Sequence, residues 1–236
     1  MVVVPAGTWN HFAMDLGLDR RKVLAALDAF GSARERSVDL AQVDGRIFVN
    51  NVSLGLYAEI IRSPEYRDAK VETALGELGR RLGPGNHPFD LRFTGPAGER
   101  HTSAHVLQVA NNAYSRAPGT LTSRPQLDGG RLGVLAVELP DPRAVAAFRA
   151  AADRDGAVPG LLAWEPSSFE VDSGGPVDAG IDGEAVRLFP PLRFSSRPAA
   201  LRIRLPEHAS GISPAARMLR ARDRLRPAPP RGQPGP

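Results

Sequence analysis

The sequence predicts an α+β protein that is predominantly β, with a sandwich-like or barrel-like body and two or three inserted helices. About eight short segments of strand-type composition recur along the chain and are separated by turn residues, a pattern typical of sheets that bury one face. Asp-Gly pairs at 44–45 and 182–183 lie between such segments, and this pair is the strongest short-range signal for a hairpin. A strand–turn–helix pattern opens the chain and differs from the rest, which predicts that the first residues belong to another unit.

The composition of the 236-residue chain is that of a globular protein, with 42% hydrophobic and 24% charged residues. Cysteine is absent, which excludes disulfides, thiolate nucleophiles and metal sites with cysteine ligands. No apolar run is long enough for a transmembrane helix, and the first residues do not resemble a signal peptide. We therefore expect a cytoplasmic protein.

The net charge of +4 is unevenly distributed. From Arg202 onward the chain has eight arginines and two acidic residues, so the preceding body carries a net charge of −2. A basic groove across the fold is therefore not expected, which argues against a nucleic-acid partner. The basic tail leaves peripheral contact with an anionic membrane surface open.

The first 36 residues predict the end of an α/β domain. Val2–Val4 predicts a short buried strand, which a turn and a helix over residues 9–16 follow. A second helix is expected over residues 20–30. Val23, Leu24, Leu27 and Phe30 share one face of this helix, and we expect that face to be exposed or mobile because its sheet partners are missing. Because one strand cannot form a sheet, we expect that the earlier part of this domain is missing from the chain.

The body begins with a predicted hairpin, whose strands over 37–43 and 46–53 flank the first Asp-Gly pair. A helix is expected within 55–82, and another, capped by Asp141, through residue 153. The remaining strands are predicted at 89–94, 100–110, 130–139, 167–172, 177–181, 185–189 and 199–205.

The end of the chain differs in composition from the body. Ser213-Pro214 predicts the start of a short basic helix that ends near Leu225. Residues 226–236 are mostly Pro, Arg, Gly and Ala, cannot bury a core, and are expected to be disordered.

Two short motifs offer groups for phosphate or proton chemistry. Gly7 and Thr8, followed by Asn10, lie at a strand-to-helix turn, where free N–H groups and the positive end of a helix dipole can hold a phosphate. The alternative is an ordinary turn in which Thr8 caps the helix. Asp182 and Glu184 flank a glycine at a hairpin tip, where a carboxylate could accept a proton from an attacking hydroxyl. The alternative is a plain surface turn.

Two further places contain residue types that can bind metal ions. Asp128 lies in a loop that enters a strand, so its carboxylate and nearby carbonyl groups could hold a hard cation, or the loop could be a simple turn. His101 and His105 lie on a predicted strand, where four residues span about 13 Å, too far to share one ion. We therefore expect two exposed strand histidines.

Five segments of the chain follow one another in a distinctive order. They are Val-Val-Pro-Ala-Gly-Thr-Trp-Asn-His-Phe-Ala at 3–13, Val-Asp-Leu at 38–40 with Phe-Val-Asn-Asn-Val-Ser-Leu-Gly at 48–55, Asp-Gly-Gly-Arg-Leu-Gly-Val at 128–134, Asp-Gly-Glu at 182–184, and Ala-Leu-Arg-Ile-Arg-Leu-Pro at 200–206. Their order and spacing over about residues 2–206 resemble those of the diacylglycerol kinase and sphingosine kinase superfamily. The first segment is similar to that family's Pro-x-Gly-Thr-x-Asn-Asp-Phe-Ala motif.

The resemblance implies an ATP- and magnesium-dependent lipid kinase that phosphorylates a lipid hydroxyl, such as that of diacylglycerol. Such proteins have an α/β nucleotide domain, a β-sandwich domain and an active site in the cleft between them. The implied organisation is the end of the nucleotide domain at 1–36, the lipid-substrate domain at 37–206 and a basic tail at 207–236. Self-association is left open.

The resemblance also assigns roles to the candidate residues. Gly7, Thr8 and Asn10 would belong to the nucleotide side of the site. Glu184, with Asp182, would be the base that activates the lipid hydroxyl, which fits the needs of phosphoryl transfer. Asp128 would be the remaining side-chain ligand of a structural magnesium ion.

The chain departs from the family pattern at three places. The Gly-Gly-Asp-Gly-Thr phosphate loop does not occur in it, His11 replaces the aspartate of the first motif, and Gly129 replaces the second aspartate of the Asp-Asp-Gly loop. We therefore expect the chain alone to bind ATP poorly and to be inactive. Two alternatives are a non-catalytic lipid- or partner-binding module derived from such a kinase, and a gene-start error that leaves a nucleotide domain encoded upstream of Met1.

Overall fold

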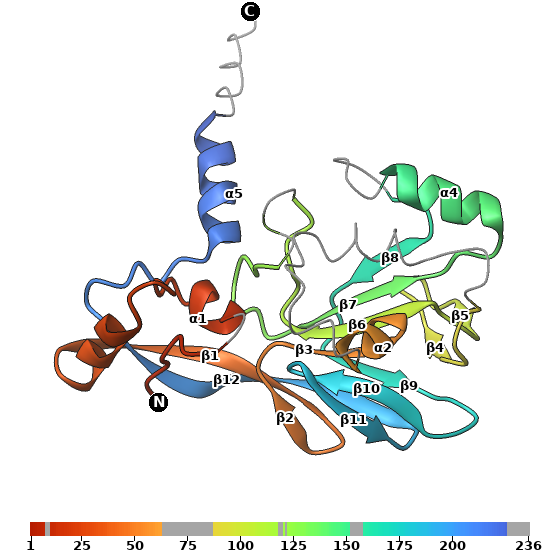
Figure 1. Ribbon diagram of the computed structural model, residues 1–236, viewed down its shortest axis with the longest axis horizontal. Coiled ribbons are helices and arrows are strands. Elements are labelled where there is room, and N and C mark those ends of the chain that lie inside the picture. The colour runs from red at the N-terminus through yellow and green to blue at the C-terminus, as the bar shows by residue number, and fades with distance from the viewer. Residues whose placement is uncertain (8–9, 63–86, 118–119, 121, 152–157, 226–236) are drawn as a thin grey trace, which may run out of the picture.

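The computed structural model describes the chain except for residues 8–9, 63–86, 118–119, 121, 152–157 and 226–236 (Figure 1). Within the described residues, two antiparallel sheets form a sandwich, and a small hairpin lies beside it. The predicted β-rich fold with inserted helices is confirmed. No helix in the described part of the chain is both long enough and apolar enough to cross a membrane.

The first sheet has four strands in the order β2-β1-β12-β9. Their bounds are β1 Ala33–Val43, β2 Arg46–Phe48, β9 Ser168–Val171 and β12 Leu192–Pro206. The second sheet has six strands in the order β11-β10-β3-β6-β7-β8. Their bounds are β3 Asn51–Gly55, β6 Val106–Asn111, β7 Leu132–Val137, β8 Leu161–Trp164, β10 Val177–Ile181 and β11 Glu184–Leu188.

The main core lies between these sheets, because alternate residues of each strand point inward. Phe48 and Phe194 from the first sheet and Leu107 from the second are fully buried there. The small hairpin, β4 Phe93–Thr94 and β5 Arg100–His101, closes one end of this core through Phe93.

Within the described ranges, five helices accompany the sheets (Figure 1). They are α1 His11–Asp15, the 3₁₀ helix η1 Val23–Phe30, α2 Leu56–Arg62, α4 Pro142–Ala151 and α5 Pro214–Leu225. A second apolar cluster packs α1 against the long strands β1 and β12, with Leu16, Val38 and Ile203 completely buried. Helix α5 stands away from the sheets and contacts the body near its first turn.

Both predicted Asp-Gly hairpins are confirmed. Asp44 and Gly45 have φ angles of 47° and 81°, and Asp182 and Gly183 have φ angles of 50° and 91°. Two consecutive residues with positive φ define the turn whose twist matches that of the flanking strands, and glycine adopts this conformation without strain. These turns join β1 to β2 and β10 to β11.

The prediction of one strand over 46–53 is wrong, because the segment divides into β2 and β3, which lie in different sheets. The N–H groups of residues 49–51 bond to a side chain instead of a neighbouring strand, as described below. The predicted strand over 100–110 is likewise divided into β5 and β6. Strand β8 was not predicted, since Leu161–Trp164 lacks an alternating pattern.

The N-terminal prediction is partly wrong. Residues 2–4 do not form a buried strand, since Val2 makes a single bridge to Arg204 and Val4 is exposed. The segment 20–30 contains a 3₁₀ helix rather than an α-helix. The exposure expected for its apolar face is found at Leu24 and Phe30, which are 77% and 68% exposed, whereas Ala26 and Ala29 are buried. The helix within 9–16 is confirmed as α1.

The later helices agree with their predicted starts. The carboxylate of Asp141 accepts N–H bonds from the first turn of α4, and Ser213 does the same for α5. Helix α2 begins where the 55–82 helix was predicted, and the rest of that segment lies outside the described residues, as does the 226–236 tail.

The expectation of two exposed histidines is wrong. His105 is 4% exposed, and its Nδ1 accepts the backbone N–H of Leu139 at 3.3 Å. His101 stacks on Phe93 with ring centroids 4.7 Å apart, and its Nδ1 lies 2.7 Å from a carboxylate oxygen of Glu138. Glu138 and Leu139, which directly follow β7, contact His101 and His105 respectively, and strand periodicity alone did not predict these contacts.

Candidate functional site

The turn between β10 and β11 is fastened to the crossing between the two sheets through Asp182. One carboxylate oxygen accepts the N–H of Val49 at 2.8 Å, and the other accepts those of Asn50 at 2.7 Å and Asn51 at 3.1 Å. The Asp182 N–H in turn donates to the carbonyl of Asn51 at 2.9 Å. These bonds hold the hairpin rigidly at this edge, and Glu184 extends from it as an exposed carboxylate at the start of β11.

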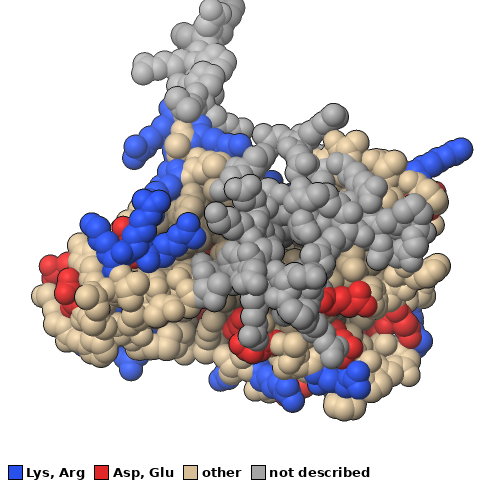
Figure 2. All heavy atoms as spheres, viewed as in Figure 1, with Lys and Arg blue, Asp and Glu red and all other residues tan. Residues whose placement is uncertain are grey.

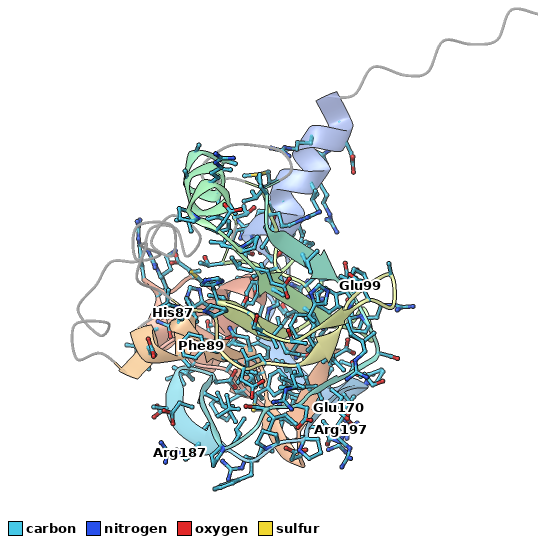
Figure 3. The ribbon with its side chains drawn as sticks, turned by 90° about the vertical axis from the view of Figure 1, so that its right-hand side faces the viewer. His87, Phe89, Glu99, Glu170, Arg187 and Arg197 are labelled. Carbon is cyan, nitrogen blue, oxygen red and sulfur yellow. The ribbon has the colours of Figure 1, made fainter. Side chains whose placement is uncertain are left out.

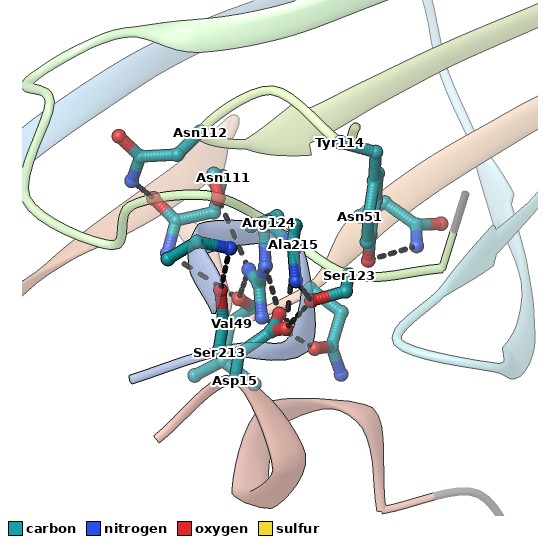
Figure 4. Close-up of polar contacts among 12 residues, drawn as sticks. Asp15, Val49, Asn51, Asn111, Asn112, Tyr114, Ser123, Arg124, Ser213 and Ala215 are labelled. Carbon is teal, nitrogen blue, oxygen red and sulfur yellow. Dashed lines mark hydrogen bonds and ion pairs between the residues drawn. The ribbon is translucent and has the colours of Figure 1, made fainter. Parts of the chain in front are cut away.

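Arg124 lies at the centre of a buried polar cluster next to this crossing (Figure 4). Its Nε donates to Asp15 Oδ2 at 2.8 Å. Its Nη1 donates to the carbonyl oxygens of Val49 at 2.6 Å and Asn111 at 3.0 Å, and its Nη2 donates to Asn50 Oδ1 at 3.0 Å. Neither Arg124 nor Asp15 has exposed side-chain surface, so the pair depends on these bonds to offset its desolvation.

The other oxygen of Asp15 joins this cluster to α5. Asp15 Oδ1 accepts bonds from the Ser123 hydroxyl at 2.8 Å and from the N–H of Arg124 at 3.1 Å. The Ser123 hydroxyl oxygen accepts the N–H of Ala215, in the first turn of α5, at 3.1 Å. Helix α1, the 123–124 loop and α5 therefore meet at one buried carboxylate.

Aromatic rings complete the surroundings of Arg124. Phe12 and Tyr114 lie with their ring centroids 5.8 and 5.4 Å from the guanidinium carbon, within the range of a cation–π contact. The Tyr114 hydroxyl accepts a bond from Asn51 Nδ2 at 3.2 Å. Burial raises the pKa of Tyr114 above its ordinary value of 10.0, and burial lowers the pKa of His11 below 6.5.

Gly7 and Asn10 form a tight turn immediately before α1. The Gly7 N–H donates to Asn10 Oδ1 at 2.8 Å, and Asn10 Nδ2 donates back to the Gly7 carbonyl at 2.7 Å. Thr8 lies outside the described residues. In the part of the chain that the structure describes, no hydrogen bond or ion pair joins this turn directly to Glu184. The two are instead connected through α1, Asp15, Arg124 and the 49–51 segment.

Asp128 lies apart from this cluster, with its side chain 54% exposed and one oxygen 3.5 Å from a guanidinium nitrogen of Arg36. Among the described residues, no group of three or more acidic or histidine side chains is placed to hold a metal ion.

A cavity of about 170 Å³ adjoins the cluster on the outer face of the six-stranded sheet. Its apolar lining is formed by Val106, Ala113, Val134, Leu135, Ala163 and Trp164. Tyr57, Gln108, Ser115, Arg116 and Glu165 add polar groups to it. Tyr114 lines this cavity, and its hydroxyl contacts Asn51. A single side chain, that of Tyr114, therefore connects the cavity to the 49–51 segment that Asp182 holds.

Arg124 and Tyr114 were not predicted as site residues. The partner of Arg124 is 109 positions away in the chain, so no local pattern could indicate the pair. The one feature of the sequence that could have indicated Arg124 was its place as a single arginine between Ser123 and Pro125. It carried little weight because the whole chain is rich in arginine and has only two lysines.

The chain is similar to proteins named as lipid kinases, and no protein-family model matches it. It is 36% identical over 80 residues to the diacylglycerol kinase of Bacillus subtilis, which is 34% of this chain and 25% of that protein. It is 25% identical over 210 residues to a protein of Pseudomonas aeruginosa named probable lipid kinase YegS-like, covering 87% of this chain and 68% of the relative.

Solved structures agree with these relatives. Two Bacillus anthracis structures described as diacylglycerol kinases superpose with TM-scores of 0.63 and 0.56 at 18% and 16% identity, and each alignment covers 87% of this chain. The alignments cover 68% and 66% of those two proteins. The chain thus matches a quarter to about two thirds of its relatives' length. The resemblance found in its motifs is confirmed, since its homologues are named diacylglycerol kinase and YegS-like lipid kinase, and it shares the diacylglycerol kinase fold.

Proposed function

We propose that this chain forms the lipid-substrate part of an ATP-dependent lipid kinase, which transfers phosphate from MgATP to a lipid hydroxyl such as that of diacylglycerol. The observation that carries the proposal is the rigid Asp182-Gly183 turn, which holds the exposed carboxylate of Glu184 beside the crossing between the two sheets. The names of the homologues support the same class of reaction.

Glu184 is proposed as the general base. A lipid hydroxyl has a very high pKa, so its proton must leave during attack, and the acceptor must stand within hydrogen-bond reach of that oxygen. An exposed carboxylate on a rigid hairpin can meet this requirement. Asp182 is proposed as its positioning partner, because both oxygens of Asp182 already accept backbone N–H groups.

The nucleotide side is proposed to include Gly7, Thr8 and Asn10, with ATP and magnesium entering as the nucleotide complex. The reciprocal bonds between Gly7 and Asn10 fix this turn at the start of α1. Asp15, at the end of the same helix, connects it to Arg124 and so to the segment beside Asp182. Positioning of this kind is the main contribution that a protein makes to phosphoryl transfer.

The cavity beside Tyr114 is proposed to take the apolar part of the lipid. Its walls are mostly apolar, and its polar lining groups include Arg116 and Glu165. The basic face around α5 supports a cytoplasmic protein in peripheral contact with an anionic membrane, since Lys and Arg side chains gather near that helix (Figure 2).

Phosphate transfer from radiolabelled ATP to diacylglycerol in mixed micelles tests the proposal. The assay uses the 236-residue chain and, in parallel, the same chain preceded by a family nucleotide domain that carries the Gly-Gly-Asp-Gly-Thr loop. We expect transfer by the joined protein and none by the chain alone, whose sequence offers no such loop to clamp the triphosphate.

In the joined protein, Glu184→Gln should lower turnover by about 10²–10⁴ while ATP affinity barely changes. The matched control is Glu170→Gln, which alters an exposed carboxylate on β9 (Figure 3). Unchanged turnover in Glu184→Gln would remove Glu184 from the reaction. Lipid binding without transfer by any form of the protein would favour the non-catalytic lipid-binding module instead.

A further inference from the structure

Asp39 is a buried carboxylate that the proposed reaction does not use. It is 1% exposed and lies on β1, where the pairing with β12 shifts register between Val38 and Leu40. Ala199, on the opposite side of this irregularity, has a φ of 52° and donates its N–H to Asp39 Oδ1 at 2.8 Å. The bulge in the sheet therefore turns a backbone donor toward Asp39.

The other bonds of Asp39 fasten the loop at 127–130. Asp39 Oδ2 accepts the N–H of Gly130 at 2.7 Å and an amide hydrogen of Asn112 Nδ2 at 3.1 Å. The N–H of Asp39 donates to the carbonyl of Leu127 at 2.7 Å. Asn112, itself 2% exposed, accepts the N–H of Gly129 at 2.9 Å through Oδ1. Two buried side chains thus bind the N–H groups of Gly129 and Gly130, and the backbone of Asp39 binds the carbonyl of Leu127, all without help from Asp128.

This arrangement leaves no room for the aspartate that the family pattern has at position 129. A β-carbon added to Gly129 would lie 2.7 Å from Asn112 Oδ1 and 2.5 Å from Gln126 Nε2, distances that real β-carbons do not show. The Gln126 side chain can move aside. Asn112 cannot do so without losing its bonds to Asp39 and to Gly129.

The charges around the loop also do not suit a cation. Three N–H donors point at the two oxygens of Asp39, whereas magnesium requires nearly octahedral oxygen ligands. Asp128, the remaining carboxylate of the loop, faces the guanidinium group of Arg36. One exposed carboxylate beside a fixed positive charge binds Mg²⁺ weakly, because the ion gives up its bound water reluctantly.

We propose that hydrogen bonds from Asp39 and Asn112 replace a structural metal ion in this chain, so that the 127–130 loop is held without a divalent cation. The magnesium that accompanies ATP is a separate matter, because it would enter with the nucleotide. The proposal needs no catalytic activity, so it stands or falls independently of the proposed function.

Thermal unfolding of the full chain, followed by circular dichroism, tests the proposal with excess EDTA and with millimolar magnesium. We expect the same melting temperature in both, and no change in Asp128→Asn. Asp39→Asn keeps the shape of the side chain but turns an amide toward N–H donors, so its melting temperature should fall by about 5–10 °C in either buffer. The melting temperature of Asn112→Ala should fall in the same way.

A magnesium-dependent rise in the melting temperature of the unaltered chain that Asp128→Asn abolishes would overturn the proposal. Calorimetric titration of magnesium into the nucleotide-free chain gives a second measurement, and saturable binding lost in Asp128→Asn would overturn it equally. Gly129→Asp provides the converse test, since it restores the family residue. Its melting temperature should fall and stay low in magnesium, and recovery by the ion would count against the proposal.

Discussion

Replacing Arg124 by methionine should strongly destabilise the fold, because the change leaves a buried charge without its partner. The guanidinium group donates to Asp15, to two backbone carbonyls and to Asn50, and it has no exposed surface. Breaking a buried ion pair by removing one partner costs about 3–5 kcal/mol. With a urea slope of about 2 kcal/mol per molar, the unfolding midpoint should fall by about 1.5–2.5 M.

Urea unfolding followed by far-ultraviolet circular dichroism measures this change. The matched control is Arg193→Met. Arg193 pairs with Glu170 on the exposed face of the four-stranded sheet, and its loss should change the free energy of unfolding by less than about 1 kcal/mol. Lysine should not rescue position 124, because one ammonium group cannot reach four acceptors in a fixed fork. An unchanged unfolding midpoint in Arg124→Met would refute the conclusion that Arg124 stabilises the buried polar cluster.

A double substitution separates the contribution of the Asp15–Arg124 ion pair to stability from that of the other hydrogen bonds of Arg124. Asp15→Leu combined with Arg124→Met removes both charges, so the double variant should be less destabilised than the sum of the two single changes. It should still be weaker than the unaltered chain by about 1–3 kcal/mol, because the carbonyl of Asn111 would remain buried without this donor. Strict additivity would show that Asp15 and Arg124 are not coupled.

Three further predictions concern stability and association. Asp182→Asn should lower the free energy of unfolding, measured by urea unfolding, by about 1–3 kcal/mol, because one of the two oxygens that accept backbone N–H groups is lost. In the joined protein, Asp182→Asn should reduce turnover less than Glu184→Gln does. Stability should fall as the pH drops below 6.5, since burial keeps His11 neutral in the folded state while the unfolded chain takes up the proton; a His11→Gln chain with the same pH dependence in urea unfolding would contradict this. The exposed Leu24 and Phe30 should cause concentration-dependent self-association in sedimentation equilibrium, and replacing both by glutamate should abolish it; a monomeric unaltered chain at all concentrations would refute the idea.

Local chemistry explains which parts of the fold the sequence could predict. The two Asp-Gly turns need only two residues that accept positive φ, and the starts of α4 and α5 need only a capping side chain, so each is visible in a window of a few residues. The division of 46–53 into two strands has a distant cause. Asp182 takes the N–H groups of the segment from a position more than 130 residues away, so alternation in the segment itself could not show it.

The same distance limits what the sequence could say of the site. Asp182 and Glu184 were recognisable as candidates because only Gly183 separates them in the chain and they lie in a known order with other motifs. Arg124 and Asp39 act through partners that only folding brings near, and an isolated arginine or a strand aspartate carries no local signature. The helix type of 20–30 could not be predicted either, because periodicity indicates which residues share a face but does not distinguish a 3₁₀ helix from an α-helix.

Under the proposed function, the two carboxylates of the hairpin have different roles. Both oxygens of Asp182 are occupied by backbone N–H donors, and accepting a further proton would disrupt the three bonds that hold residues 49–51. Asp182 is therefore poorly placed to act as a base. Glu184, two residues later, is exposed at the first position of β11 and can accept a proton without breaking the turn. The Asp-Gly-Glu spacing thus supports a positioning role for the first carboxylate and a chemical role for the second. For this reason Asp182→Asn should reduce stability first, whereas Glu184→Gln should reduce turnover with little effect on stability.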